Sequence, residues 1–209
     1  MDEILPGIHH WTSHDEELGT PVSSYYVDPA GVLIDPTVPD QGLDAFAGLT
    51  TPQQAVLTNR RHVRESARFR EAFGCAVRAP AAARDELAAL DVRPYWPGDE
   101  VGPGVIAVEI DVIAEDETAL HVTFGGGAIA FGDALVRPGG VLGFPADETL
   151  GAHPLRKRKG LKEAFRGLLL RDFDALLVAH GEPLRDDGKR ALREFVELPV
   201  EYPEDGPYA

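Results

Sequence analysis

Cysteine is nearly absent from this chain of 209 residues, which carries only Cys75. A single cysteine cannot form a disulfide within the chain, and without a Cys-x-x-Cys partner it gives no indication of a thiol-based active site. A chain of this length can bury enough apolar surface in one core to fold without disulfides. A lone cysteine is typical of a small buried side chain in a reducing compartment, so we expect a cytoplasmic protein.

Long apolar runs are also lacking. No stretch reaches the roughly 18 residues that a membrane-spanning helix needs. Residues 1–6 have neither the basic nor the apolar region of a signal peptide. We therefore expect a protein without a membrane segment.

Positive charge is scarce, and the net charge is −15. Such a charge repels nucleic acid and anionic membranes, so we expect neither as a partner. The one basic run, Arg156–Lys159, is interpreted as a solvated loop and helix start. A patch that binds phosphate or nucleic acid is the alternative.

The signatures of several enzyme classes are missing as well. No Gly-x-Ser-x-Gly segment indicates a serine hydrolase of the α/β type. No Gly-x-Gly-x-x-Gly segment follows a strand to indicate a dinucleotide site. The glycines at 125–127 are not followed by a Lys-Ser or Lys-Thr pair, so they predict a hairpin turn rather than a phosphate loop.

The apolar pattern that is present alternates between strands and helices. We expect strands at residues 23–27, 32–34, 53–58, 77–79, 105–110, 119–123, 128–131 and 174–179, and helices at residues 62–73, 81–90, 161–170 and 188–196. Two blocks of strands interspersed with helices predict an α/β protein with two sheets packed face to face and helices outside. We expect one domain over residues 1–200 and a frayed acidic tail at 201–209.

Four segments of the chain resemble the metallo-β-lactamase superfamily. The strands before Asp35 resemble that family's first strands, and Ala55–Thr58 resembles the strand leading into its motif Thr-His-x-His-x-Asp-His. The segments beginning at Glu117 and Phe131 resemble its Gly-His-Thr and Gly-Asp segments, and Val178–Gly181 resembles its final His-Gly. The resemblance implies an αββα sandwich of two mixed sheets with helices outside.

Most of the family's metal-ligand positions are replaced in this chain. When Thr58 is aligned with the motif, the replaced positions are Asn59, Arg61, Val63, Arg64 and Glu117. The family has His, His, Asp, His and His at these five places. Only Asp133 and His180 keep the family's residue types, and His62 lies one residue out of register.

These replacements conflict with a dinuclear metal centre. A catalytic zinc needs three ligands from His, Asp, Glu or Cys, and arginine cannot serve because it stays protonated. Our first hypothesis is therefore a degenerate, non-catalytic or small-molecule-binding member of the fold, with no metal cofactor and an anionic small molecule as its partner. Its pocket is expected to contain Asn59, Arg61, His62, Arg64, Glu117, Asp133 and His180.

The alternative hypothesis is a metal-dependent hydrolase with a rebuilt single-metal site. One zinc, iron or manganese ion would be held by Glu117, Asp133 and His180, with His62 as a further candidate. The resemblance then implies an ester or thioester as substrate.

The arginines offer a replacement for the metal charge. Without a metal, Glu117 and Asp133 would face each other, and two close carboxylates cannot both stay ionised without a counter-charge. We expect Arg61, together with Arg64, to bridge Glu117 or Asp133 through forked hydrogen bonds. The alternative is that both arginines turn to solvent and pair with surface acids such as Glu65.

Overall fold

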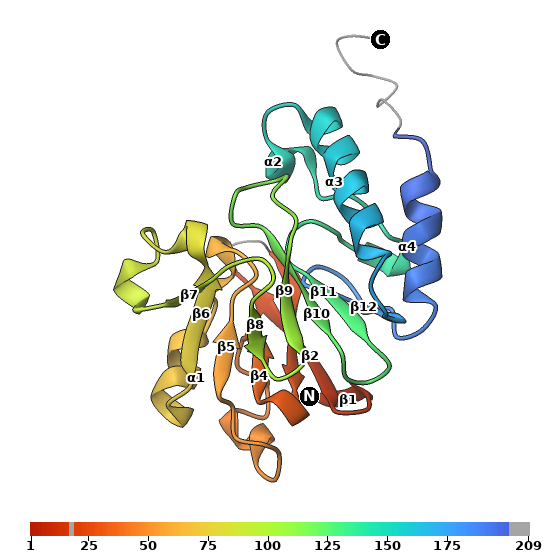
Figure 1. Ribbon diagram of the computed structural model, residues 1–209. Coiled ribbons are helices and arrows are strands. Elements are labelled where there is room, and N and C mark those ends of the chain that lie inside the picture. Colours follow the sequence, from red (N-terminus) through yellow and green to blue (C-terminus); the bar gives the residue numbers. More distant parts are fainter. Residues whose placement is uncertain (17–18, 201–209) are drawn as a thin grey trace.

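The structure is a computed structural model that describes residues 1–16 and 19–200 (Figure 1). Within these residues, two sheets pack against each other. In strand order, the first sheet contains β1 (Asp2–Leu5), β2 (Ile8–Asp15), β3 (Thr20–Val27), β4 (Val32–Ile34), β5 (Gln54–Val56), β6 (Ala76–Pro80) and β7 (Arg93–Tyr95). The second contains β12 (Ala175–Val178), β11 (Ala128–Phe131), β10 (Thr118–Val122), β9 (Val105–Glu109) and β8 (Glu100–Gly102).

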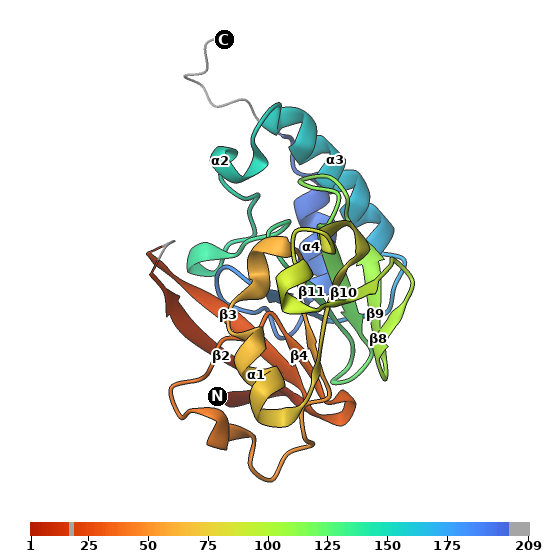
Figure 2. The same ribbon diagram turned by 90° about the vertical axis from the view of Figure 1, so that its left-hand side faces the viewer.

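Helices cover the outer faces of both sheets. The α-helices are α1 (Ser66–Phe73), α2 (Asp147–Leu150), α3 (Pro154–Leu168) and α4 (Gly188–Glu197). Helix α1 lies against the first sheet, and α3 and α4 pack against the second (Figures 1 and 2). Each sheet contains both parallel and antiparallel neighbours. The predicted αββα sandwich of two mixed sheets is therefore confirmed. None of the described helices has the length and apolar character that crossing a bilayer requires.

Strands buried on both faces explain the apolar runs in the sequence. In β4, Val32 and Ile34 point into the layer between the sheets, and Leu33 points outward to the layer beneath α1. In β12, Leu177 points between the sheets, and Leu176 packs against the layer of α3 and α4. The sequence of a strand that is buried on both faces is a continuous apolar run, because polar side chains on either face would lack hydrogen-bond partners.

The segment at 81–90, expected to be a helix, is instead two short 3₁₀ turns, Ala81–Ala83 and Ala88–Leu90. Only two of its side chains, Ala83 and Leu87, are buried, so little packing energy offsets the cost of starting a helix. Asp91 then takes a left-handed conformation, with φ 48°, and ends the turn.

Two further differences concern the first strands and the start of α3. Residues 2–15 form a hairpin, β1 and β2, that the sequence pattern did not indicate. Helix α3 begins at Pro154, seven residues before the expected start, so the basic run Arg156–Lys159 lies within a helix. A proline is favourable at a first helical position, where its missing N–H costs nothing. The tail at 201–209, expected to fray, lies outside the described residues.

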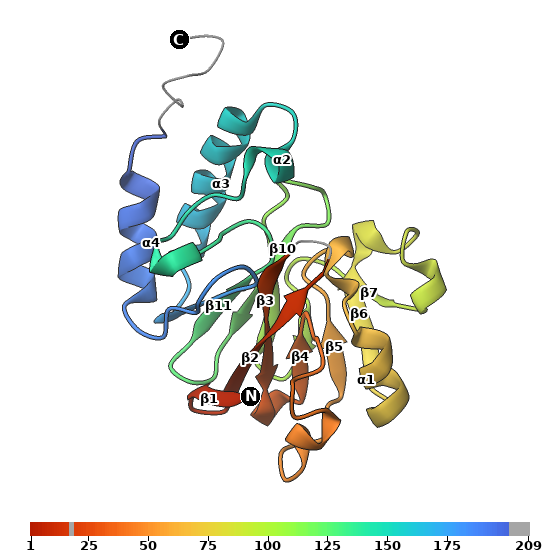
Figure 3. The same ribbon diagram turned by 180° about the vertical axis from the view of Figure 1, so that it is seen from behind.

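The topology brings four strand ends to one edge of the sandwich. Strands β4 and β5 are parallel neighbours in one sheet, and β11 and β12 are parallel neighbours in the other. Hydrogen bonds tie the sheets together at this edge: Ser23 N–H donates to Ala179 O at 2.8 Å, and Tyr25 Oη donates to Val178 O at 2.8 Å. From behind, β2 and β3 lie between α1 and the layer of α3 and α4 (Figure 3). The loops that follow these four strands carry the polar residues described next.

Candidate functional site

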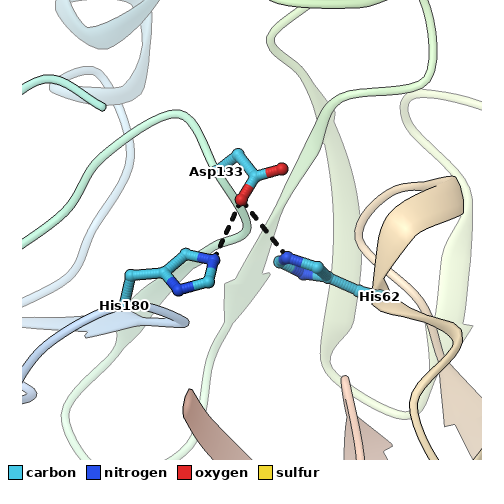
Figure 4. Close-up of side chains that lie close together, drawn as sticks. All are labelled: His62, Asp133 and His180. Carbon is cyan, nitrogen blue, oxygen red and sulfur yellow. Dashed lines mark hydrogen bonds and ion pairs between the residues drawn. The ribbon is translucent and has the colours of Figure 1, made fainter. Parts of the chain in front are cut away.

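Three side chains from separate loops meet at this edge, as Figure 4 shows. His62 lies on the 3₁₀ turn Arg60–Val63 after β5, Asp133 follows β11, and His180 follows β12. His180 Nε2 is 2.9 Å from Asp133 Oδ1, and His62 Nε2 is 3.3 Å from the same oxygen. One ligand atom from each residue lies within 4.8 Å of the other two. The expected proximity of Asp133 and His180 is thus confirmed, with His62 as a third member.

Asp35 fixes the orientation of His62. Its carboxylate accepts hydrogen bonds from Thr58 N at 2.8 Å and Thr58 Oγ1 at 2.7 Å, and Oδ2 lies 2.8 Å from His62 Nδ1. The second nitrogen of the ring, Nε2, is thereby directed at Asp133. Burial by itself would lower the pKa of His62, but the charge of Asp35 and the hydrogen bonds to Asp133 and Asp35 outweigh it and raise the pKa to about 9. His62 is therefore an imidazolium cation between two carboxylates at neutral pH.

The two carboxylates flanking His62 are held ionised. Burial disfavours the charged form of Asp133, but hydrogen bonds to His180 and His62 outweigh this and hold its pKa well below the usual range. The pKa of Asp35 is lowered as well, because the charge and hydrogen bond of His62 outweigh its burial. Asp35, His62, Asp133 and His180 therefore form one continuous chain of charge-assisted hydrogen bonds.

Glu117 and Asn59 form the floor of the site beneath Asp133. Asn59 Nδ2 donates to Glu117 Oε2 at 2.8 Å and to Asp133 Oδ2 at 3.2 Å, and Ala134 N donates to Glu117 Oε1 at 2.9 Å. Burial, with the nearby negative charge of Asp133, raises the pKa of Glu117 to about 8. At neutral pH Glu117 is a neutral carboxylic acid, so it does not repel Asp133.

Gly132 packs tightly beneath this floor. A Cβ atom added there would lie 2.5 Å from Thr58 Oγ1 and 3.1 Å from both Asn59 Nδ2 and Glu117 Oε1. All three neighbours are buried and hydrogen-bonded, so they cannot move aside freely. The site therefore requires glycine at this position.

We expect Gly132→Ala to lower the free energy of unfolding by about 1–3 kcal/mol, the usual cost of overpacking a buried site. Urea denaturation would measure the change. Gly167→Ala is a matched control, because Gly167 is exposed on α3 and an added Cβ there meets no atom within 4 Å. The control should be neutral or stabilising by up to about 1 kcal/mol, as alanine favours a helix more than glycine does. Equal effects of the two changes would contradict the tight packing.

The two arginines do not replace the metal as expected. Arg64 Nη1 donates to Ser23 O at 2.5 Å and to Asp35 O at 2.8 Å, so its guanidinium holds the backbone behind the site. Arg61 is exposed, and its guanidinium has no hydrogen-bond or ion-pair partner among residues 1–16 and 19–200. The prediction that Arg61 or Arg64 bridges Glu117 or Asp133 is wrong.

The alternative expectation, that both arginines turn to solvent and pair with surface acids such as Glu65, is confirmed only for the exposure of Arg61. Glu65 accepts a hydrogen bond from Val38 N at 2.6 Å and pairs with Arg68 at 2.5 Å. His62 supplies the internal cation instead. The signal that would have found it is a histidine four residues after Thr58, within reach of the aspartate that closes the preceding strand.

An open cavity of about 540 Å³ lies over the three converging side chains. Its lining residues are Asp15, Thr20, Val22, Arg61, His62, Arg64, Asp133, Val136, Pro145, Ala146, Thr149 and His180. A second cavity of about 540 Å³ shares Arg61 and Asp133 with the first and also contains Asn59 and Glu117. The seven residues expected to form one pocket are thus distributed over two adjoining cavities. The sizes lie within the usual range for small-molecule sites.

No family model and no curated protein sequence matches the chain. Solved structures do match it. A metallo-β-lactamase superfamily protein from the archaeon Sulfolobus tokodaii is 13% identical, with a TM-score of 0.60 over 96% of this chain and 90% of that one. A metallo-β-lactamase from Erythrobacter litoralis is 14% identical, with a TM-score of 0.64 over 92% of each chain. One from Cronobacter sakazakii, described by its HARLDQ motif, is 16% identical, with a TM-score of 0.60 over 93% and 92%.

The chain has the metallo-β-lactamase fold. The residues at the positions of the family's metal motif do not fit a dinuclear metal centre. At two of the five replaced metal-ligand positions, Arg61 and Arg64 carry guanidinium groups that cannot ligate a metal. At a third, Val63 has an apolar side chain. The guanidinium of Arg64 is moreover already bonded to two backbone carbonyls.

A single divalent metal ion does fit the three converging side chains of this chain. His62, Asp133 and His180 offer two imidazole nitrogens and a carboxylate, a ligand set used by zinc and by non-haem iron. The carboxylate of Asp35 on the far nitrogen of His62 is the outer partner that metal-binding histidines usually have. Glu117 lies outside the converging group, and the third member of the group is His62, the further candidate ligand expected from the sequence.

Proposed function

We propose that this protein is a metal-dependent hydrolase with a single-metal site, acting on a small ester or thioester. The observation that carries the proposal is the convergence of ligand atoms from His62, Asp133 and His180 within 4.8 Å of one another, beneath a cavity of about 540 Å³. Three protein ligands leave a coordination position open, which is the arrangement of catalytic rather than structural zinc. When bound, a divalent ion would polarise a carbonyl group and lower the pKa of a water molecule.

The residues around the ligands have separate tasks in this proposal. Asp35 accepts a hydrogen bond from His62 Nδ1 and leaves Nε2 for the metal. Asn59 binds Oδ2 of Asp133, so that Oδ1 is left facing the two histidines. Metal binding requires neutral imidazole, so His62 must release its proton when the ion enters.

A second candidate function is the binding of an anionic small molecule without any metal. It is favoured by the completeness of the hydrogen-bonded chain, in which the His62 imidazolium already compensates Asp35 and Asp133. The exposed guanidinium of Arg61 lines the same cavity and supplies a positive charge for such a molecule.

Metal titration separates the two candidates. Calorimetry of chelator-treated protein with Zn²⁺ and with Mn²⁺ should give one site per chain. His62→Ala, Asp133→Asn and His180→Ala should each weaken metal binding by about a hundredfold or more, because losing even an outer-shell partner costs 10–100-fold. His9→Ala is the matched control, since His9 is half-buried on β2 and does not line the cavity.

Activity is then measured on p-nitrophenyl acetate and on a short thioester, with and without added metal. Metal-dependent hydrolysis that disappears in the three ligand variants and persists in His9→Ala would support the hydrolase. A protein that binds neither ion more tightly than its His62→Ala variant would exclude the metal site and leave the anion-binding candidate.

A further inference from the structure

Arg61 occupies an unusual position between the two cavities. It lines both of them, together with Asp133, and its side chain is exposed. Its neighbours Arg60 and Arg64 by contrast use their guanidinium groups within the protein: Arg60 pairs with Asp116 at 2.7 Å, and Arg64 donates to backbone carbonyls. Within the described ranges, the guanidinium of Arg61 has no protein acceptor. Its donors are therefore available to a bound molecule.

The backbone that carries Arg61 is fixed on both sides. Arg61 N donates to Asn59 Oδ1 at 2.9 Å, and Arg60 N donates to Asp116 Oδ2 at 2.6 Å. His62, on the other side, is bonded to Asp35. The 3₁₀ turn thus places the Cα of Arg61 rigidly beside the cavities, and only the side chain must be ordered when a ligand binds. A pre-positioned donor loses less entropy on binding than one on a mobile loop.

Other charged groups of the first cavity already interact with one another. The Asp133 carboxylate is compensated by His62 and His180, and the charge of Asp15 acts on Arg64. Arg61 consequently provides a positive charge that no described acid pairs with, in a chain of net charge −15. An anionic group on a ligand would be attracted here, although the protein as a whole repels anions.

We propose that Arg61 binds a carboxylate group of the substrate, so that the site selects esters or thioesters of short dicarboxylic acids over those of uncharged acids. The substrate class rests on the proposed function, whereas the anion site at Arg61 does not. One guanidinium presents two parallel N–H groups, which match the two oxygens of a carboxylate. A phosphate would leave a third oxygen without a donor from this residue.

Apolar side chains in the lining of the first cavity suit the chain between the two ends of such a substrate. Val22, Val136, Pro145 and Ala146 contribute apolar surface to this lining. A few methylene groups lying against these side chains would connect a carboxylate at Arg61 to the reacting carbonyl near Asp133 and His180.

Matched substrates test the selectivity. The metal-loaded protein is assayed with the mono-p-nitrophenyl ester of glutaric acid and with p-nitrophenyl butyrate, which lacks the carboxylate. Arg61→Gln should raise KM for the glutarate ester by about tenfold to a hundredfold, the range for losing a charge-assisted hydrogen bond, and should leave the butyrate ester within about twofold. Arg68→Gln, an exposed arginine on α1 that lines neither cavity, is the control and should change neither. Equal effects of Arg61→Gln on both esters would overturn the inference.

A binding experiment keeps this result separate from the hydrolase itself. Glutarate and inorganic phosphate are titrated into metal-free wild-type and Arg61→Gln protein by calorimetry. Glutarate binding that Arg61→Gln weakens at least tenfold supports the anion site, even if no ester is hydrolysed and the proposed function fails. Glutarate binding that is undetectable or unchanged by the substitution overturns the inference. Phosphate binding more tightly than glutarate at Arg61 overturns the assignment of a carboxylate.

Discussion

Replacing His62 by alanine should lower the free energy of unfolding of the metal-free protein by about 3–5 kcal/mol, the cost of removing one partner from a buried ion pair. Both carboxylates bonded to His62 are buried, with side chains 2% and 13% exposed for Asp35 and Asp133. Without the imidazolium, Asp35 still accepts the hydrogen bonds from Thr58 and still feels the more distant charge of Arg64. It loses the one cation that is hydrogen-bonded to its carboxylate. For a chain of this size the melting temperature should fall by roughly 10 °C.

A double-mutant cycle tests whether the loss comes from the pair. Asp35→Asn alone should also destabilise the protein, but His62→Ala combined with Asp35→Asn should cost less than the sum of the two, because the uncompensated charge is gone. His9→Ala, in which a half-buried histidine outside the site is removed, should change stability by much less. Full additivity of His62→Ala and Asp35→Asn would show that the two side chains do not stabilise each other in the folded protein.

The architecture was readable from the sequence because its strands bury both faces. The runs around Val32–Ile34 and Ala175–Val178 are apolar without interruption, and such runs identify central strands of a layered α/β fold. The hairpin of β1 and β2 was missed for the opposite reason. Most of residues 8–15 are polar, and only Ile8 and Trp11 among them are buried, so no continuous apolar run marks β2 in the sequence.

The site was predicted in part because strand ends in parallel pairs must meet. Asp133 and His180 follow neighbouring parallel strands, so their proximity follows from the order of segments. The roles of Arg61 and His62 did not follow, because they depend on which way each side chain leaves a single 3₁₀ turn. A shift of the turn by one residue would exchange the side chains that point inward and outward. A turn of four residues is too short for a periodic apolar pattern to indicate which side chains point inward.

The stability of the metal-free protein should fall as the pH rises from about 6.5 to about 9. The pKa of His62 is raised from its ordinary 6.5 to about 9 in the folded protein. A raised pKa means that the stabilisation is fully present below the unfolded value and is lost as the pH rises through the folded value. A difference of this size corresponds to about 3 kcal/mol.

Glu117 acts in the same direction over a lower range. Its pKa rises from an ordinary 4.5 to about 8, so its neutral form in the folded protein is progressively disfavoured between these values. The pKa values of three carboxyl groups are lowered, those of Asp35, Asp133 and Asp116. Their stabilising contribution is lost only as the pH falls below about 4. The metal-free protein should therefore be most stable on the acid side of neutrality.

Urea midpoints at pH 5, 7 and 9 in the presence of a chelator measure this profile. Glu117→Gln should remove the part of the decline below pH 8, and His62→Gln should remove the part above pH 6.5. In each variant, the remaining group should still make stability fall as the pH rises. Stability that is flat or rising between pH 6.5 and 9 in the wild type would exclude the imidazolium.

A bound metal should remove the part of the decline between about pH 6.5 and 9 that comes from His62. Only the neutral imidazole of His62 can be a ligand, so proton and metal compete for the same nitrogen. At a fixed metal concentration the apparent affinity rises with pH until His62 is deprotonated, and the stabilisation by the ion rises with it. Saturating Zn²⁺ should thus stabilise the wild type more at pH 8 than at pH 6.5, and should have no such effect on His62→Gln. A protein whose decline toward pH 9 is unchanged by Zn²⁺ would use the imidazolium as its only internal cation, and the anion-binding function would then be the better account of the cavity.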